Sequence, residues 1–249
     1  MSKLSLGLLG ENISKSPSPI LHNFIYNYFN IEAEYKLYEI KRESFHEKIN
    51  YIIKNNYGLN VTMPYKELII KYTKEVSDDA KKIGAINTIK GDIGYNTDYL
   101  AFKKMLSQYD IKTCLIMGAG GSARAASFAV SELDPDIILI YNRSVERAMN
   151  LINDLKKIGT NATYIQSLNG IEVDALINTI PVDLDFNIKS KTIYVDLVYT
   201  RKAKKISQNI IDGIDFLIEQ GLLSDEIWFN IKADEEVKKY VRKLVRKSF

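Results

Sequence analysis

The sequence has little of what metal-binding and disulfide-bonded proteins depend on. It contains one cysteine and two histidines in 249 residues, so no disulfide can form within the chain. Cys114 stands in the apolar run Cys114-Leu115-Ile116-Met117, where a buried structural side chain is expected rather than a nucleophile. His22 and His46 lie far from any partner at ligand spacing. The sequence therefore predicts no metal site.

Long apolar runs and a strong net charge are missing as well. The apolar stretch from Leu4 to Leu9 is too short for a signal peptide, and no run approaches the roughly 20 residues of a membrane span. The formal net charge is +3 and is spread along the chain, which argues against nucleic acid or an anionic membrane as the main partner. We therefore expect a cytoplasmic protein, and a small anionic ligand stays compatible with this charge.

The composition is that of an ordinary globular protein. Hydrophobic residues make up 46% of the chain and charged residues 26%, which is enough for a full core and gives no sign of disorder. A length of 249 residues is at the upper end for a single hydrophobic core. Two domains that share a cleft are therefore expected as readily as one large domain.

Strand-like runs alternate with helical stretches along most of the chain. The first part has predicted strands at 4–9, 33–40 and 59–62, predicted helices at 19–28, 44–55 and 77–83, and a hairpin at 85–96. The second part has predicted helices at 98–108, 122–133 and 145–158, and predicted strands at 113–117, 137–141, 174–178 and 192–197. Such alternation implies an α/β fold with parallel sheets, and we place a domain boundary near Asp98.

The last predicted helix, 234–247, is amphipathic. Its apolar face comprises Val237, Tyr240, Val241, Leu244 and Val245. Its basic face is interpreted as the solvated side of a capping helix rather than as a nucleic-acid surface, because amphipathic helices usually turn their charge towards water.

A glycine-rich turn joins the strand predicted at 113–117 to the helix that follows. Its residues are Gly118, Ala119, Gly120, Gly121, Ser122 and Ala123. The first glycine allows a tight turn, the second lets the backbone approach a pyrophosphate, and alanine takes the third position, where a small side chain lets helix pack on strand. The pattern alone fits plain helix–strand packing equally well. Its place between a strand and a helix favours a phosphate site at the helix N-terminus.

The next strand is followed by Asn142, Arg143 and Ser144. An NAD-specific site usually has an acidic residue here, which accepts a hydrogen bond from the ribose 2′-hydroxyl. Arg143 instead offers a permanently charged fork to a 2′-phosphate, so the sequence favours NADP over NAD. The alternative is that Asn142 and Ser144 only turn the chain and cap the next helix.

Two polar clusters follow predicted strands in the first part of the chain. Lys66 ends the segment Asn60–Lys66, and Asp98 ends the segment Gly94–Asp98. Hydride addition to a ketone generates an alkoxide, and an ammonium held by a carboxylate can stabilise that charge and donate the proton. The alternatives are a solvated surface lysine and, for Asp98, an N-cap of the following helix.

Ser16 and Ser18 precede the helix predicted at 19–28. Two hydroxyls at a helix N-terminus suit a substrate carboxylate. Read in isolation, capping and turn formation by Ser18 and Pro19 explain the segment better.

Taken together, these segments resemble the shikimate dehydrogenase family in order and spacing over nearly the whole chain. The resemblance is carried by Gly10–Pro19 (glycine to S-x-S-P), Asn60–Lys66 (N-V-T-x-P-x-K), Gly84–Thr88 (G-A-x-N-T), Asn96–Asp98 (N-T-D), Gly118–Ala123, Asn142–Ser144 (N-R-[ST]), Asp196–Tyr199 and Gln220. The motif N-V-T-x-P-x-K, combined with N-T-D further along the chain, is very specific to this family.

The resemblance implies an NADP-dependent oxidoreductase that reversibly reduces 3-dehydroshikimate to shikimate, a step of aromatic amino-acid and chorismate biosynthesis. It implies an α/β substrate-binding and catalytic domain formed by residues 1–98 and 220–249, with a C-terminal helical segment that returns to it. Residues 99–219 then form a Rossmann-like NADP-binding domain. The partner is a small-molecule substrate, and the expected assembly is a monomer or a homodimer.

The resemblance also assigns roles to individual residues. Lys66 and Asp98 are implied as the catalytic pair, and Ser16 and Ser18 as ligands of the substrate carboxylate. The residues implied around the ring hydroxyls are Asn60, Thr62, Asn87, Asp98, Tyr199 and Gln220. The glycine-rich turn and Asn142–Ser144 are implied to bind the cofactor.

Several positions depart from the family pattern. Lys15 replaces a usual histidine, Tyr99 and Ala101 replace glycines, Asn178–Pro181 replaces N-A-T-S, and Asp225 stands where phenylalanine is usual. None of these removes a proposed catalytic group. The two alternatives are a broader enzyme that also accepts quinate and a non-catalytic NADPH-binding module. Retention of both Lys66 and Asp98 argues against the module.

Overall fold

The computed structural model describes residues 3–181, 188–201 and 203–248. The chain divides into two compact units. The first contains Met1–Thr97 and Leu217–Phe249, and the second contains Asp98–Phe216. Among the described residues, no helix is long and apolar enough to cross a membrane.

The first unit is built on a six-stranded sheet with the order β2-β1-β3-β5-β6-β4. The strands are β1 (Leu4–Gly10), β2 (Ala33–Glu39), β3 (Gly58–Val61), β4 (Glu75–Val76), β5 (Thr88–Lys90) and β6 (Ile93–Tyr95). β1 pairs in parallel with β2 and β3, and β5 is antiparallel to β3 and β6. This half of the sheet is therefore not parallel. The predicted hairpin is confirmed as β5 and β6, and its turn contains Gly91 at a φ of +57°.

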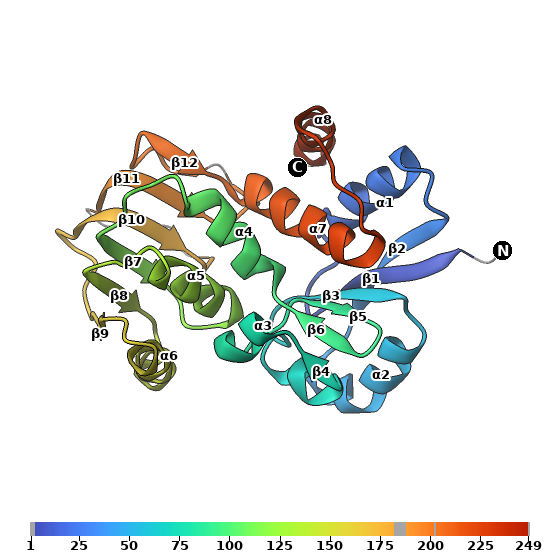
Figure 1. Ribbon diagram of the computed structural model, residues 1–249, viewed down its shortest axis with the longest axis horizontal. Coiled ribbons are helices and arrows are strands. Elements are labelled where there is room, and N and C mark those ends of the chain that lie inside the picture. Colours follow the sequence, from blue (N-terminus) through green and yellow to red (C-terminus); the bar gives the residue numbers. More distant parts are fainter. Residues whose placement is uncertain (1–2, 182–187, 202, 249) are drawn as a thin grey trace. The chain divides into compact units, whose positions relative to one another are not determined.

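Helices cover both faces of this sheet (Figure 1). The helices are α1 (Ser18–Tyr28), α2 (Arg42–Lys54), the short 3-10 helix η1 (Leu68–Tyr72), α3 (Asp78–Ile83) and α7 (Gly213–Phe229). α2 buries Phe45 and Ile49 in a core cluster that includes Leu59 of β3. α7 is fixed to the sheet by Trp228, whose indole Nε1 donates to the carbonyl of Ile89 over 2.9 Å.

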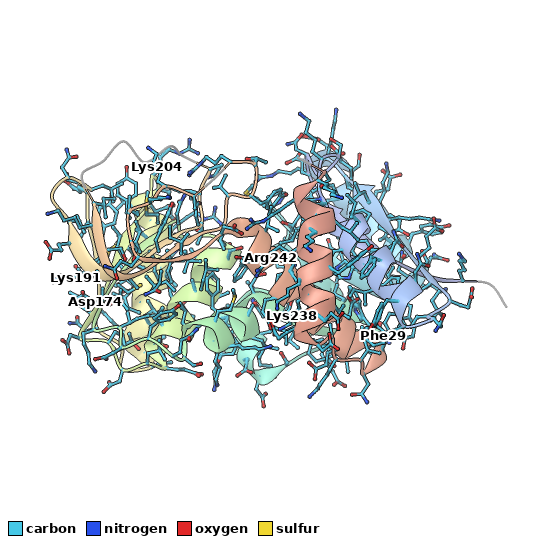
Figure 2. All side chains as sticks on the ribbon, turned by 90° about the horizontal axis from the view of Figure 1, so that it is seen from above. Phe29, Asp174, Lys191, Lys204, Lys238 and Arg242 are labelled. Atoms are coloured by element: carbon cyan, nitrogen blue, oxygen red, sulfur yellow. The ribbon has the colours of Figure 1, made fainter. Side chains whose placement is uncertain are left out.

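The chain ends in α8 (Glu235–Arg246), close to the predicted bounds. Asp234 caps it by accepting a hydrogen bond from the backbone N–H of Val237 over 2.9 Å. Val237, Val241 and Val245 are buried as expected, whereas Tyr240 is 56% exposed and stacks on Phe24 of α1. Figure 2 shows Lys238 and Arg242 on this helix.

The second unit contains a six-stranded parallel sheet with the order β12-β11-β10-β7-β8-β9. The strands are β7 (Thr113–Met117), β8 (Ile137–Tyr141), β9 (Ala162–Tyr164), β10 (Glu172–Asn178), β11 (Lys189–Asp196) and β12 (Asn209–Ile211), and the helices are α4 (Thr97–Leu106), α5 (Gly121–Ser131) and α6 (Val145–Lys157). This order reverses beside the central strand β7, as in dinucleotide-binding folds. The expected α/β class with a Rossmann-like unit is confirmed.

Candidate active site

The glycine-rich turn lies directly after β7. Gly118 adopts a φ of +120°, and a Cβ there would lie 2.3 Å from Oγ1 of Thr179. Glycine is therefore required at this position. Gly120 is the N-cap of α5, a Cβ there would meet nothing within 4 Å, and no described side chain caps the helix. The N-terminus of α5 therefore has an open Gly120 and no side-chain cap, a combination that suits a phosphate.

The two alanines of this turn are packed against their surroundings. Ala119 and Ala123 are buried, and the Cβ of Ala123 lies 3.5 Å from the position that a Gly118 Cβ would take. Gly121 and Ser122 form the first turn of α5. The small third position of the motif therefore lets α5 approach its strand, as the pattern predicted.

Asn142, Arg143 and Ser144 follow β8. Ser144 caps α6 by accepting a hydrogen bond from the N–H of Arg147, and Asn142 donates to the carbonyl of Ser144 over 2.8 Å. Asn142 and Ser144 therefore turn the chain and cap the helix, as the alternative interpretation predicted, whereas Arg143 takes no part in the cap. The Arg143 side chain is exposed, and no ion pair is found for it among the described residues.

Two other arginines of the second unit are held by carboxylates. Arg124 pairs with Asp154 at 2.8 Å, and Arg201 pairs with the buried Asp196 at 3.0 Å. Both carboxylates compete with any phosphate for these guanidinium groups. Arg143 is accordingly the better-placed cation for a 2′-phosphate.

Asp98 lies inside the first turn of α4, which begins at Thr97. The interpretation of Asp98 as the N-cap of this helix is therefore wrong. Its side chain is buried, and its Oδ2 accepts a hydrogen bond from the hydroxyl of Ser122 over 3.1 Å. The structure thus joins the proposed catalytic carboxylate to the glycine-rich turn, a contact that the sequence did not reveal.

Lys66 belongs to the first unit and follows β3. The loop before it is fixed by backbone hydrogen bonds, from the N–H of Thr62 to the carbonyl of Leu9 over 2.8 Å and from the N–H of Ile86 to the carbonyl of Lys66 over 2.9 Å. The Lys66 side chain is half-buried rather than fully solvated. Its pairing with Asp98 of the second unit stays a prediction.

A buried polar network joins three of the predicted substrate residues. Asn60 accepts from the hydroxyl of Tyr35 over 2.7 Å and donates to the carbonyl of Asn87 over 3.2 Å. Asn87 donates to Oε1 of Gln220 over 3.3 Å. Gln220 lies on α7, so a residue near the C-terminus reaches the centre of the first sheet. Asn60 is committed to internal contacts, and its substrate role stays a prediction.

Sequence reasoning missed the residue at the centre of this network, Ser224. Its hydroxyl lies 2.8 Å from Nδ2 of Asn60, 2.9 Å from Oγ1 of Thr88 and 3.2 Å from Oγ1 of Thr97. Its position could have been inferred from the sequence, because Ser224 lies four residues after Gln220 and therefore on the same face of a helix.

Ser16 and Ser18 are brought together at the start of α1. The Ser16 hydroxyl donates to the Ser18 hydroxyl over 3.1 Å. The N-cap is Pro17, and no described side chain caps the helix, so capping by Ser18 is wrong. Both hydroxyls lie beside an uncapped helix N-terminus, where a carboxylate is favoured.

The departures from the family pattern make contacts of their own. The buried Tyr99 donates a hydrogen bond to Glu132 of the same unit. Thr179 donates to the carbonyl of Met117 over 2.7 Å, and Ile180 packs against Gly118. Tyr199 is half-buried and follows β11. Thr179 and Ile180 therefore support the tight turn that precedes α5.

These features define a two-unit α/β protein with a dinucleotide-binding sheet and a second sheet that carries a polar network. The family model described as the shikimate dehydrogenase substrate binding domain matches residues 8–89. A shikimate dehydrogenase of Sulfurisphaera tokodaii is 40% identical over 96% of both chains. The shikimate dehydrogenase (NADP(+)) of Sulfolobus acidocaldarius is 39% identical over 96% of both chains.

A solved structure agrees with these relatives. The shikimate 5-dehydrogenase of Thermus thermophilus, determined in complex with NADP(H) and shikimate, superposes with a TM-score of 0.81 at 25% identity. It covers 99% of this chain and 100% of the other. The chain therefore belongs to the shikimate dehydrogenase family.

Proposed function

We propose that this protein catalyses the reversible NADPH-dependent reduction of 3-dehydroshikimate to shikimate. The observation that carries the proposal is the 40% identity, over 96% of both chains, with a shikimate dehydrogenase. The crystallised relative that binds NADP(H) and shikimate supports the same cofactor and substrate. The chain also retains Lys66 and Asp98, the two groups assigned to proton transfer.

The turn after β7 fits the cofactor. An open Gly120, an uncapped helix N-terminus and an exposed Arg143 suit a pyrophosphate and a 2′-phosphate respectively. NADPH supplies the hydride that reduces the ring carbonyl carbon. The residues of this chain bind and orient the reactants and handle the proton.

The proton is assigned to Lys66. Hydride addition leaves the carbonyl electron pair on oxygen, and the ammonium Nζ of Lys66 donates a proton to that alkoxide. In the reverse direction the neutral amine takes the proton from the hydroxyl of shikimate. Asp98 is assigned as the carboxylate partner of Lys66 in this step, and its Oδ2 is oriented by the hydrogen bond from Ser122.

Substrate recognition is assigned to the first unit. The paired hydroxyls of Ser16 and Ser18 suit the carboxylate, with the N-terminus of α1 adding a favourable dipole. Asn87 and Gln220, joined by a hydrogen bond, offer amide groups to the ring hydroxyls. Thr62 and Tyr199 are proposed to complete the surroundings of the ring.

An assay of purified protein with each substrate and each cofactor tests the proposal. Shikimate with NADP should generate the reduced cofactor, and NAD should be used less efficiently. Quinate is the comparison substrate, and equal kcat/KM for quinate would identify a broader polyol-acid dehydrogenase. Cofactor binding without turnover of either substrate would refute the enzymatic function and favour the non-catalytic module.

A further inference from the structure

The first unit contains a buried acidic and basic pair that the reaction does not use. Nδ1 of His22 on α1 lies 2.9 Å from Oδ1 of Asp225 on α7, and each side chain is 1% exposed. The pair joins two helices that are distant in the sequence. A hydrogen bond between these atoms restricts both the distance between the two side chains and their relative orientation.

The Asp225 carboxylate and its neighbours are enclosed by protein. Its second oxygen, Oδ2, is buried, and the buried hydroxyl of Tyr26 is the other polar group that interacts with this carboxylate. A buried ionisable pair is commonly no more stabilising than apolar side chains of similar volume. Stability alone is therefore a weak account of this arrangement.

The pair belongs to a closed ring of contacts between α1, α7 and the sheet. The His22 ring stacks on Tyr35 with centroids 4.1 Å apart. The Tyr35 hydroxyl donates to Oδ1 of Asn60 over 2.7 Å, and Nδ2 of Asn60 donates to Ser224 over 2.8 Å. Ser224 and Asp225 are neighbours in the sequence, so the chain itself links the last of these contacts back to the His22–Asp225 pair. We refer to these five residues as the contact ring.

The contact ring lies one helical turn from predicted substrate residues on both helices. Ser18 precedes His22 by four positions and therefore shares its face of α1. On α7, Gln220 precedes Ser224 by the same spacing. Gly221 permits the close approach of the helices, because a Cβ there would lie 3.2 Å from Leu21 and 3.5 Å from His22.

We propose that His22 and Asp225 are positioning residues that set the spacing between Ser18 on α1 and Gln220 on α7, and thereby the affinity for shikimate. The inference rests on the proposed function. Neither residue touches the reacting atoms in this account. They act through α1, α7 and Asn60, so they should affect substrate binding more than the chemical step.

The test compares Asp225→Leu with Asp225→Asn. Leucine removes the hydrogen bond to His22, whereas asparagine can keep it without the charge. Interaction energies between contacting residues correspond to effects of several-fold to about 100-fold. We expect Asp225→Leu to raise the KM and the calorimetric Kd for shikimate by about 5–50-fold, with kcat and the KM for NADP changed less than about threefold. Asp225→Asn should restore most of the affinity.

A matched control separates positioning from general destabilisation. Asp174 in the second unit accepts hydrogen bonds from the backbone N–H of Thr113 over 2.8 Å and of Lys112 over 3.1 Å. Asp174→Asn should lower the thermal midpoint without changing the KM for shikimate. His22→Phe keeps a ring against Tyr35 and supplies the same test if Asp225→Leu does not fold.

A double-mutant cycle completes the experiment. His22→Phe and Asp225→Leu should be non-additive in the shikimate Kd, because either change breaks the same contact. Wild-type affinity in either folded variant would overturn the positioning role while leaving the proposed function intact. A wild-type protein that neither binds nor oxidises shikimate would overturn the proposed function and this inference together.

Discussion

The hydroxyl of Ser122 donates a hydrogen bond to Oδ2 of Asp98 over 3.1 Å. Ser122 opens α5 immediately after the turn assigned to the cofactor phosphates, and Asp98 is the carboxylate assigned to the proton-transfer pair. One hydrogen bond therefore links the predicted cofactor-binding turn to the predicted catalytic carboxylate. A change in the glycine-rich turn can alter the orientation of the catalytic carboxylate without altering its chemistry.

Ser122→Ala should lower kcat by about 3–10-fold, the equivalent of one ordinary hydrogen bond. The same change should have no further effect when Asp98 has already been replaced by alanine, because alanine leaves the Ser122 hydroxyl no side-chain acceptor at this position. Steady-state kinetics of the two single variants and the double variant measure this. Ser127→Ala is the control, since among the described residues that hydroxyl donates to the carbonyl of Ala123 in the same helix, over 2.8 Å. Additive losses in the double variant would show that Ser122 acts on something other than Asp98.

Ser16 and Ser18 are expected to bind the substrate carboxylate. Replacement of both by alanine should raise the KM for shikimate and leave the KM for NADP nearly unchanged. A hydrogen bond to a charged group contributes about 1.5–3 kcal/mol, so the KM should rise by at least about tenfold. Isothermal calorimetry with shikimate is the direct measurement. Unaltered affinity in the double variant would exclude this role.

Arg143 is expected to make the enzyme selective for NADP, because the two cofactors differ only in the 2′-phosphate. The charge-assisted pair should contribute about 1.5–3 kcal/mol, less whatever solvent screening removes from an exposed pair. Arg143→Ala should therefore erase most of a preference of about 10–150-fold in kcat/KM, with NAD activity nearly unchanged. Arg147, an exposed arginine on α6, is the control position. A preference that survives Arg143→Ala would place the selectivity elsewhere.

Asp174, which is labelled in Figure 2, should give the second unit a pH-dependent contribution to its stability. Burial raises the pKa of this carboxyl, but hydrogen bonds from Thr113 and Lys112 outweigh burial, and its pKa is lowered from the ordinary value of 3.8. A lowered pKa in the folded state means that the contribution is present above pH 3.8 and is lost as the pH falls through the folded-state value.

Asp174→Asn should consequently reduce the free energy of unfolding at neutral pH by about 1–3 kcal/mol. The difference from wild type should shrink in acid. Urea denaturation at neutral and acid pH measures both. Glu172→Gln on the same strand is the control, because its ion pair with Lys191 is half-exposed on both sides and should contribute little. A difference that does not depend on pH would contradict the assignment.

The strongly periodic elements of the fold could be predicted from the sequence. The bounds of β7 and β8 agree with those predicted, since each is a short apolar run between clear turn signals. Helix α7 was not predicted from its own pattern, and neither were four short elements, β4, β9, β12 and η1. The short elements contain two to five residues each, too few to show a period. Their conformation is imposed by neighbouring strands and by the core rather than by their own sequence.

The candidate site was predictable in its residues but not in its connections. Local signals identified the glycine-rich turn, Lys66, Asp98 and the two serines. The contacts of Ser122 with Asp98, and of His22 with Asp225, join side chains that are 24 and 203 positions apart. One sequence contains no information on which distant side chains meet. The hairpin of β5 and β6 was predicted, but the antiparallel pairing of β5 with β3 was not, because pairing between distant strands is set by the tertiary fold.

The kcat of Lys66→Ala with shikimate and NADP tests the proposed reaction and its proton donor most directly. The loss of a positioned acid or base should lower kcat by about 10²–10⁴-fold, while the Kd for shikimate changes much less. Lys71→Ala, an exposed lysine five positions further on, should retain wild-type activity. A folded Lys66→Ala enzyme with kcat within about threefold of wild type would contradict the assignment of the proton donor.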